Sequence, residues 1–185
     1  MRVLGVDEAG RGPLAGPVVA AAVWLQPQEM RTLWKMGLRD SKKLSPLRRE
    51  KIFAEMLRLG VLWRAQAASP LRIDRENILQ ASLWAMRRSV EQFPFTPDLV
   101  VVDGNCPIPS LACPQKTVIK GDGRVLSVGA ASVVAKVLRD RVMITLDPFY
   151  PGYGFARHKG YPTKMHREAL RHLGATPWHR RSFSW

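Results

Sequence analysis

Cysteines, acidic residues and long apolar runs are all scarce in this sequence. Among its 185 residues, two are cysteine and 15 are acidic, against 29 lysines and arginines. Two cysteines are too few for a disulfide framework or for a four-cysteine zinc site. No stretch approaches the roughly 20 apolar residues that a bilayer span requires, so we expect no membrane partner. The early acidic residue Asp7 is unlike a secretory signal, and we expect a cytoplasmic protein.

The excess of basic residues gives the chain a formal net charge of +14. A charge of this size favours a polyanionic partner, and nucleic acid is the commonest one. The alternative interpretation is that the charge only keeps the protein in solution.

The apolar pattern alternates between short continuous runs and helical spacing. No repeat, low-complexity tract or long linker interrupts it, so we expect a single domain over residues 1–185. Strands that alternate with helices predict an α/β sheet covered by helices, and Asp74 is the expected N-cap of one of them. The expected strands are residues 3–6, 17–25, 61–68, 99–102 and 117–119, and the expected helices are 47–59, 74–93, 127–146 and 163–173.

Acidic residues lie at the ends of three of the expected strands. They are Asp7 with Glu8, Asp103, and Asp122. Sites gather at strand ends in open α/β sheets, and the ends of neighbouring parallel strands lie only about 4.8 Å apart. Clustered carboxylates repel one another unless a cation lies between them, and Mg²⁺ prefers oxygen ligands. These residues therefore indicate a divalent-metal site, in which two ions would suit phosphodiester hydrolysis. The alternative is that each aspartate only begins a turn.

The adjacent pair Asp7 and Glu8 presents a geometric difficulty. Successive residues of a regular strand point to opposite faces, so such a strand cannot aim both side chains at one site. We therefore expect the strand to end or bend at Glu8, where Ala9 and Gly10 follow. Regular strand geometry as far as Arg11 would count against Glu8 as a metal ligand.

The acidic pair is followed closely by Gly10, Arg11 and Gly12. Glycines let the main chain approach a ligand closely, and arginine adds a fork of donors that suits phosphate. Alone, this tripeptide would usually be a turn. Beside two carboxylates, it predicts a loop that binds phosphate next to a metal.

Residues 5–19, in which an acidic pair precedes Gly-Arg-Gly-Pro, closely resemble the opening of bacterial ribonuclease HII. Further segments match the same family in order, so that the resemblance spans nearly the whole chain. The resemblance implies a ribonuclease H-like fold, with a central mixed β-sheet flanked by helices. The further segments are residues 40–45, 102–105, 120–122, 130–136, 153–163 and 180–183.

The resemblance also implies an activity and a set of site residues. The activity is hydrolysis of the RNA strand of RNA–DNA hybrids, and incision 5′ of single ribonucleotides embedded in duplex DNA. We expect a monomer that uses two Mg²⁺ or Mn²⁺ ions for in-line hydrolysis and leaves 3′-hydroxyl and 5′-phosphate ends. Main-chain groups of the glycine-arginine-glycine loop would sense the ribose 2′-hydroxyl, which distinguishes RNA from DNA. The implied metal-binding catalytic residues are Asp7, Glu8, Asp103 and Asp122, and the implied substrate-binding residues are Gly10, Arg11, Gly12 and Tyr161.

Lys42, Lys43 and Lys120 lie in the matching segments and are candidates for phosphate contacts, although exposed lysines often serve only solubility. Two other functions stay open. A non-catalytic nucleic-acid-binding module could share the fold, but it would have no use for four carboxylates facing phosphates. Another two-metal nuclease, such as a junction resolvase or transposase core, would have no use for a ribose-sensing loop.

Overall fold

The computed structural model describes residues 1–38 and 44–184, and its centre is a five-stranded sheet in the order β3-β2-β1-β4-β5. The central strand β1 pairs antiparallel with β2 and parallel with β4. β3 extends the antiparallel side and β5 the parallel side. The expected mixed sheet flanked by helices is therefore confirmed. The strands are β1 (Val3–Ala9), β2 (Val18–Trp24), β3 (Leu62–Ala68), β4 (Leu99–Asp103) and β5 (Gln115–Val118).

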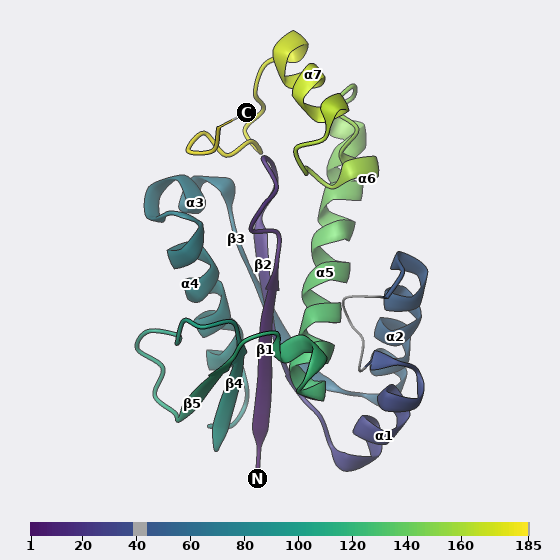
Figure 1. Cartoon of the computed structure of the whole chain (residues 1–185), viewed down its shortest axis with the longest axis vertical. Coiled ribbons are helices and arrows are strands. Elements are labelled where there is room, and N and C mark those ends of the chain that lie inside the picture. The colour runs from purple at the N-terminus through teal and green to yellow at the C-terminus, as the bar shows by residue number, and fades with distance from the viewer. Residues whose placement is uncertain (39–43, 185) are drawn as a thin grey trace.

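Helices cover both faces of this sheet, with α3 and α4 on one side and α5 with α2 on the other (Figure 1). Helices α6 and α7 lie beyond the far end of β1, next to the C-terminal segment. None of the helices in the described part of the chain has the length and apolar character needed to cross a membrane. The helices are α1 (Pro27–Lys35), α2 (Pro46–Leu59), α3 (Pro70–Glu76), α4 (Ile78–Glu91), α5 (Leu126–Leu146), α6 (Phe155–His158) and α7 (Lys164–Leu173), with short 3₁₀ turns η2 (Gly121–Gly123) and η3 (Asp147–Phe149).

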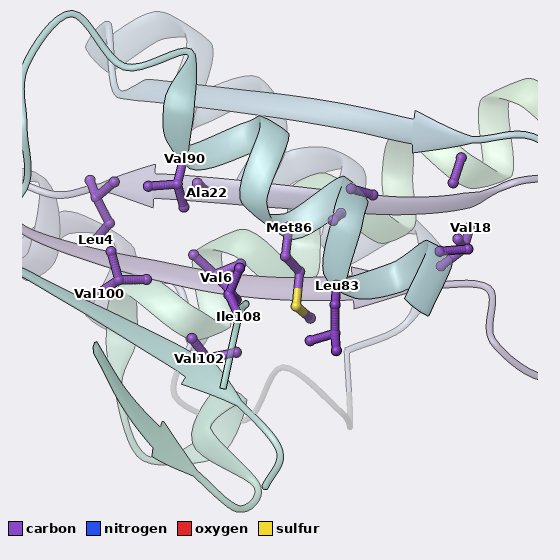
Figure 2. Close-up of a cluster of buried hydrophobic side chains, with 14 of the residues drawn as sticks. Leu4, Val6, Val18, Ala22, Leu83, Met86, Val90, Val100, Val102 and Ile108 are labelled. Atoms are coloured by element: carbon purple, nitrogen blue, oxygen red, sulfur yellow. The ribbon is translucent and has the colours of Figure 1, made fainter. Parts of the chain in front are cut away.

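The alternation of side chains along β1 decides which face each site residue occupies. Leu4 and Val6 pack under Leu83 and Met86 of α4, as Figure 2 shows. The intervening positions, including Gly5, therefore face α5. A Cβ atom on Gly5 would lie 2.2 Å from the main chain of α5, so glycine allows the helix to pack directly on the strand.

The expected helix over residues 74–93 is wrong, because two helices occupy this stretch. α3 ends and α4 begins at Asn77, whose φ of 71° lies outside the helical region. The N-cap of α4 is Asn77, whose side chain accepts a hydrogen bond from the Gln80 amide. Asp74 lies inside α3 and instead accepts hydrogen bonds from the main-chain amides of Arg181 and Ser182. Asp74, which anchors a distant segment, was mistaken for the N-cap of a nearby helix.

The remaining expected elements are confirmed apart from their ends. The strand expected at 117–119 begins two residues earlier and ends one residue earlier, at Gln115–Val118. Helix α1, which the sequence pattern did not reveal, begins after Gln26 with Pro27 in its first turn. Its Glu29 side chain accepts a hydrogen bond from the Gln26 amide, and proline and an acidic residue are typical of a helix N-terminus.

The C-terminal segment returns to the start of the chain and pairs with the loop that follows β1. The Arg180 amide donates to the carbonyl of Leu14, and the Gly16 amide donates to the carbonyl of Trp178, at 2.9 and 2.8 Å. Residues more than 160 positions apart thus form one main-chain unit. This pairing holds the loop after β1 between the C-terminal segment and α5.

Candidate active site

The four acidic residues singled out from the sequence come from three adjacent elements. Val6 of β1 pairs with Val102 of β4 in parallel register. The next residue of each strand is an aspartate, so Asp7 and Asp103 are neighbours on adjacent strands. The Asp103 carboxylate accepts a 2.6 Å hydrogen bond from the Gly121 amide, which ties β4 to turn η2. Asp122 is the next residue of that turn and is 3 % exposed. The carboxyl ends of β1 and β4 therefore place Asp7 and Asp103 side by side, and Asp122 follows the residue whose amide binds Asp103.

The expectation that β1 ends or bends at Glu8 is wrong. β1 keeps regular pairing through Ala9, with Glu8 opposite Ala20 of β2. The side chains of Asp7 and Glu8 accordingly lie on opposite faces of the sheet. The bend comes one residue after the strand, at Gly10, whose φ is +101°. Regular strand geometry therefore stops before Arg11. Asp7 and Glu8 both lie near the carboxyl end of β1, one on each face of the sheet.

On one face, the Asp7 side chain points toward α5, where the side chain of Ser132 opposes the rise in the pKa of Asp7. On the other face, Glu8 lines a cavity of about 120 Å³ together with Asp103 and Arg11. Leu79 and Leu83 of α4 form the apolar side of this cavity. Asp103, at the end of its strand, is thus close enough to raise the pKa of both Asp7 and Glu8.

The electrostatics of these carboxylates agree with their proximity. Burial raises the pKa of Asp7 well above its usual range, and the negative charges of Glu8 and Asp103 raise it further. Burial also raises the pKa of Glu8, where Arg11 opposes the increase and Asp103 adds to it. Arg11 lies 3.5 Å from the Glu8 carboxylate and is its cationic neighbour. The ionised forms of Asp7 and Glu8 are therefore disfavoured when no cation is bound.

The chemistry of these donors fits a hard divalent cation. Carboxylate oxygens are the ligands of Mg²⁺ and Mn²⁺, and a cation would relieve the repulsion that raises the pKa of Asp7. The side chains do not form a complete metal-binding site. Within residues 1–38 and 44–184, no group of three or more His, Cys, Asp or Glu side chains is arranged so that it could hold a metal ion.

The loop of Gly10, Arg11 and Gly12 lies beside this acidic edge. Gly10 is buried against Arg139 of α5, since a Cβ atom at Gly10 would lie 2.0 Å from the Arg139 Nε atom. Arg11 and Gly12 are exposed. A Cβ atom at Gly12 would lie 3.9 Å from the ring of Tyr161, which is itself 40 % exposed. The structure thus brings the loop and the tyrosine into one surface.

The lysines named from the sequence are only partly placed. Lys42 and Lys43 lie outside the described residues. Lys120 is exposed, and its left-handed conformation (φ 57°) begins the turn that carries Asp122. A lysine to which we assigned no role, Lys136 of α5, has its ammonium 5.5 Å from the centre of the Tyr161 ring. Its position one helical turn before Asp140, with which it forms a 2.7 Å ion pair, gave no sign of this in the sequence.

The family model for ribonuclease HII matches residues 4–185 of the chain. The chain belongs to the ribonuclease HII family. It is therefore an endonuclease that hydrolyses the RNA of RNA–DNA hybrids. The ribonuclease HII of Ruegeria pomeroyi is 52% identical over 183 residues, which are 99% of this chain and 76% of the relative.

Solved structures agree with the family assignment. The crystal structure of ribonuclease H2 from Pyrococcus horikoshii OT3 is 27% identical, with a TM-score of 0.83 over 100% of this chain and 94% of the other. A Bst ribonuclease HIII crystallised with Mn²⁺ shares the fold at 17% identity, with a TM-score of 0.80 over 100% of this chain and 67% of the other. The expected ribonuclease H-like fold is thereby confirmed.

Sequence reasoning missed two buried arginines of this ribonuclease HII, Arg139 and Arg180. Both side chains are completely buried, and both contact the loop after β1. For Arg139 a signal was present, because it replaces an apolar residue in the buried row of Ala135 and Met143 at helical spacing. For Arg180 the sequence offers only its place in a segment that resembles the family.

Proposed function

We propose that the enzyme incises duplex DNA on the 5′ side of a single embedded ribonucleotide, in addition to hydrolysing the RNA of hybrids. The observation that carries this proposal is the exposed loop at Arg11 and Gly12 beside Asp7 and Glu8. A loop next to the carboxylates can contact the ribose on the same nucleotide whose phosphodiester is cleaved. The 2′-hydroxyl, as donor and acceptor, is the group that separates a ribonucleotide from its deoxy neighbours.

The carboxylates of this site would hold divalent cations, Mg²⁺ or Mn²⁺. The ribonuclease HIII of the same fold was crystallised in complex with Mn²⁺. Two such ions would activate a water and stabilise the leaving oxygen of the phosphodiester, which leaves 3′-hydroxyl and 5′-phosphate ends. Asp7 and the other acids would supply the carboxylate oxygens that hold these ions. The residues that would hold the ions are Asp7, Glu8, Asp103 and Asp122.

The protein's own groups would bind and orient the nucleic acid. The main chain of Gly10, Arg11 and Gly12 would face the ribose, and Arg11 would contact phosphate when it leaves Glu8. The exposed ring of Tyr161, next to Gly12, would pack against the sugar that follows the ribonucleotide. Lys120, at the turn of Asp122, would contact the phosphate backbone.

A labelled DNA duplex with one ribonucleotide tests this proposal, with an all-DNA duplex and an RNA–DNA hybrid as controls. Each is incubated with Mg²⁺, Mn²⁺ or a chelator, and the products are sized. We expect a single cut 5′ of the ribonucleotide that requires a divalent cation, no cut in the all-DNA duplex, and cleavage of the hybrid. Cleavage of the hybrid without any cut at the single ribonucleotide would contradict the proposal.

The same assay separates the two competing functions. Binding of the duplexes without cleavage under any metal condition would support a non-catalytic module. Cleavage of the all-DNA duplex would support a nuclease that does not read ribose.

A further inference from the structure

The guanidinium group of Arg180 lies beneath the glycine-arginine-glycine loop. Its Nη2 atom donates to the Gly10 carbonyl at 2.5 Å, its Nη1 atom to the Arg11 carbonyl at 3.0 Å, and its Nε atom to the Gly16 carbonyl at 3.0 Å. The side chain is completely buried. One side chain from the C-terminal segment therefore binds both peptide groups of the Gly10–Gly12 stretch.

Arg139 of α5 binds the continuation of the same loop. Its Nη2 atom donates to Ala15 and its Nε atom to Pro17, while Nη1 donates to the carbonyl of Lys159, all at 3.0 Å. Lys159 precedes Gly160 and Tyr161, so Arg139 connects the loop to the segment that carries the tyrosine. Its guanidinium carbon lies 5.8 Å from the centre of the Tyr161 ring.

These hydrogen bonds are unusual for buried arginines. All six end on main-chain carbonyls rather than on carboxylates. Burial of a charged group costs free energy, and here each nitrogen of the two guanidinium groups donates to a carbonyl. Burial and the neighbouring charge of Arg139 lower the pKa of Arg180 to about 9, so the group still carries its charge at neutral pH. Two positive charges thus lie under a loop that faces a polyanion.

The direction of the carbonyls fixes the direction of the amides. Every peptide bond of the described chain is trans, and in a trans peptide the C=O and N–H bonds point in opposite directions. Because the carbonyls of Gly10 and Arg11 point inward to Arg180, the amides of Arg11 and Gly12 point away from it. Arg11 and Gly12 are the exposed residues of the loop. The two donors therefore face the side from which nucleic acid approaches.

We propose that Arg180 is a positioning residue for ribose recognition, which holds the carbonyls of Gly10 and Arg11 inward so that the following amides face the 2′-hydroxyl, and that Arg139 supports the same loop from α5. This inference rests on the proposed ribose-reading function of the loop. Neither arginine touches the substrate, and both act through the main chain of residues 10–17.

The test compares binding of two duplexes that differ only in one 2′-hydroxyl, in an Asp7→Asn background in which the substrate is not cut. Arg180→Lys retains the charge, but one ammonium cannot reach three carbonyls in the planar arrangement of a guanidinium. We expect the ratio of the two dissociation constants to fall by about tenfold, the value of one hydrogen bond of ordinary strength. Arg139→Lys is the second variant, and we expect its ratio to fall in the same direction by a smaller factor.

Ile52→Ala is the matched control for general destabilisation. Ile52 is completely buried in α2, in the cluster on the α5 side of the sheet, and is not part of the loop. Thermal unfolding is measured for every variant. We expect the control to lower the unfolding midpoint without a change in the ratio of the two dissociation constants. Arg180→Lys, in contrast, should change that ratio.

The outcomes are distinguishable. If the Asp7→Asn parent itself shows no preference for the ribonucleotide, the proposed ribose-reading function fails. If the parent has the preference and Arg180→Lys folds and keeps it unchanged, the loop is read without help from Arg180 and the inference is overturned. If neither lysine variant folds, or if the Ile52→Ala control loses the preference equally, the arginines serve only stability and the inference is likewise overturned.

Discussion

Asp7 carries a carboxylate whose ionised form its surroundings disfavour. It is 5 % exposed, and burial together with Glu8 and Asp103 raises its pKa. A folded-state pKa above the unfolded value means that the negative charge reduces the stability of the metal-free protein near neutral pH. Natural selection retains such a group where its charge is needed for function, as perturbed pKa values at functional sites commonly indicate.

Replacing Asp7 by Asn should separate activity from stability. We expect cleavage of a hybrid to fall by at least about a thousandfold, because electrostatic positioning of phosphate and metal is lost. The unfolding midpoint in the presence of chelator should stay the same or rise, because a disfavoured charge is removed. Cleavage kinetics and thermal unfolding of the same preparation check both. Residual activity of a tenth of the parent rate would remove Asp7 from the centre of the site.

At the scale of elements, the packing of α5 on β1 determines how Asp7, on β1, is placed relative to the side chains of that helix. The helix lies so close that a Cβ atom at Gly5 would be 2.2 Å from both the Ser127 carbonyl carbon and the Val128 nitrogen. The same helix carries Ser132, which opposes the rise in the pKa of Asp7, and Arg139, which binds the loop. A shift of this one interface would therefore displace several parts of the site.

Gly5→Ala should reduce the free energy of unfolding by about 1–3 kcal/mol or more, because a main-chain clash can be relieved only by moving α5. Denaturant unfolding measures this loss. Gly123→Ala is a suitable control, since a Cβ atom there meets nothing within 4 Å. Equal stabilities of the two variants would show that the β1–α5 contact is looser than the structure indicates.

Three buried histidines join α6, α7 and the C-terminal segment. The Nε2 atoms of His166 and His179 are 3.0 Å apart, and the rings of His158 and His166 stack with centroids 4.4 Å apart. Burial lowers the pKa of each, and with the neighbouring His166 it lowers the pKa of His179 to about 4. Protonation of any one places a charge in a site that favours neutral rings.

The free energy of unfolding should therefore fall as the pH drops below about 6.5, the usual histidine value. The unfolded chain binds protons that the folded one excludes, so stability is complete above the unfolded pKa and is lost toward the folded pKa. His179 alone would contribute about 3 kcal/mol over the interval to pH 4. Unfolding midpoints measured between pH 7.5 and 4.5 test this.

The unfolding midpoint of His179→Gln should depend less on pH than that of the parent. His172→Gln, at an exposed position of α7, should show the same pH dependence as the parent. The comparison between variants is needed because Asp7 and Glu8, with raised pKa values, act in the opposite direction as the pH falls. Identical profiles for all three proteins would rule out His179 as the cause.

At the scale of the whole molecule, the net charge of +14 predicts that nucleic-acid binding depends strongly on salt. Each phosphate contact releases counterions, so the logarithm of the binding constant should fall with the logarithm of salt concentration by about 0.9 per contact. Binding of an uncut duplex by Asp7→Asn at several salt concentrations measures the slope. A flat response would contradict a phosphate-binding surface.

Lys120→Ala should reduce this slope by about 1 if the lysine contacts phosphate. Arg58→Ala removes the same charge from α2, where Arg58 is paired with Glu55, and should leave the slope close to that of the parent. Equal slopes for Lys120→Ala and the parent would remove Lys120 from the binding surface.

Local patterns in the sequence were enough to predict most secondary-structure elements and the family of this protein. Apolar runs and helical spacing placed most strands and helices, because burial of one face has a fixed period along the chain. Carboxylates after strands 3–6, 99–102 and 117–119 indicated a metal site without any knowledge of strand order. The resemblance to ribonuclease HII was carried by short segments whose spacing is local, and it anticipated the family correctly.

Only the tertiary structure decided the contacts between residues far apart in the chain. Arg180 and Gly10 are 170 positions apart, and no local preference indicates that a buried guanidinium will meet that carbonyl. The strand geometry at Glu8 was likewise decided by its partner, because β2 offers Ala20 and Val19 as pairing residues and so carries β1 on to Ala9. Hydrogen-bond partners of buried charged groups depend on which surfaces pack together, and packing is a property of the folded chain as a whole.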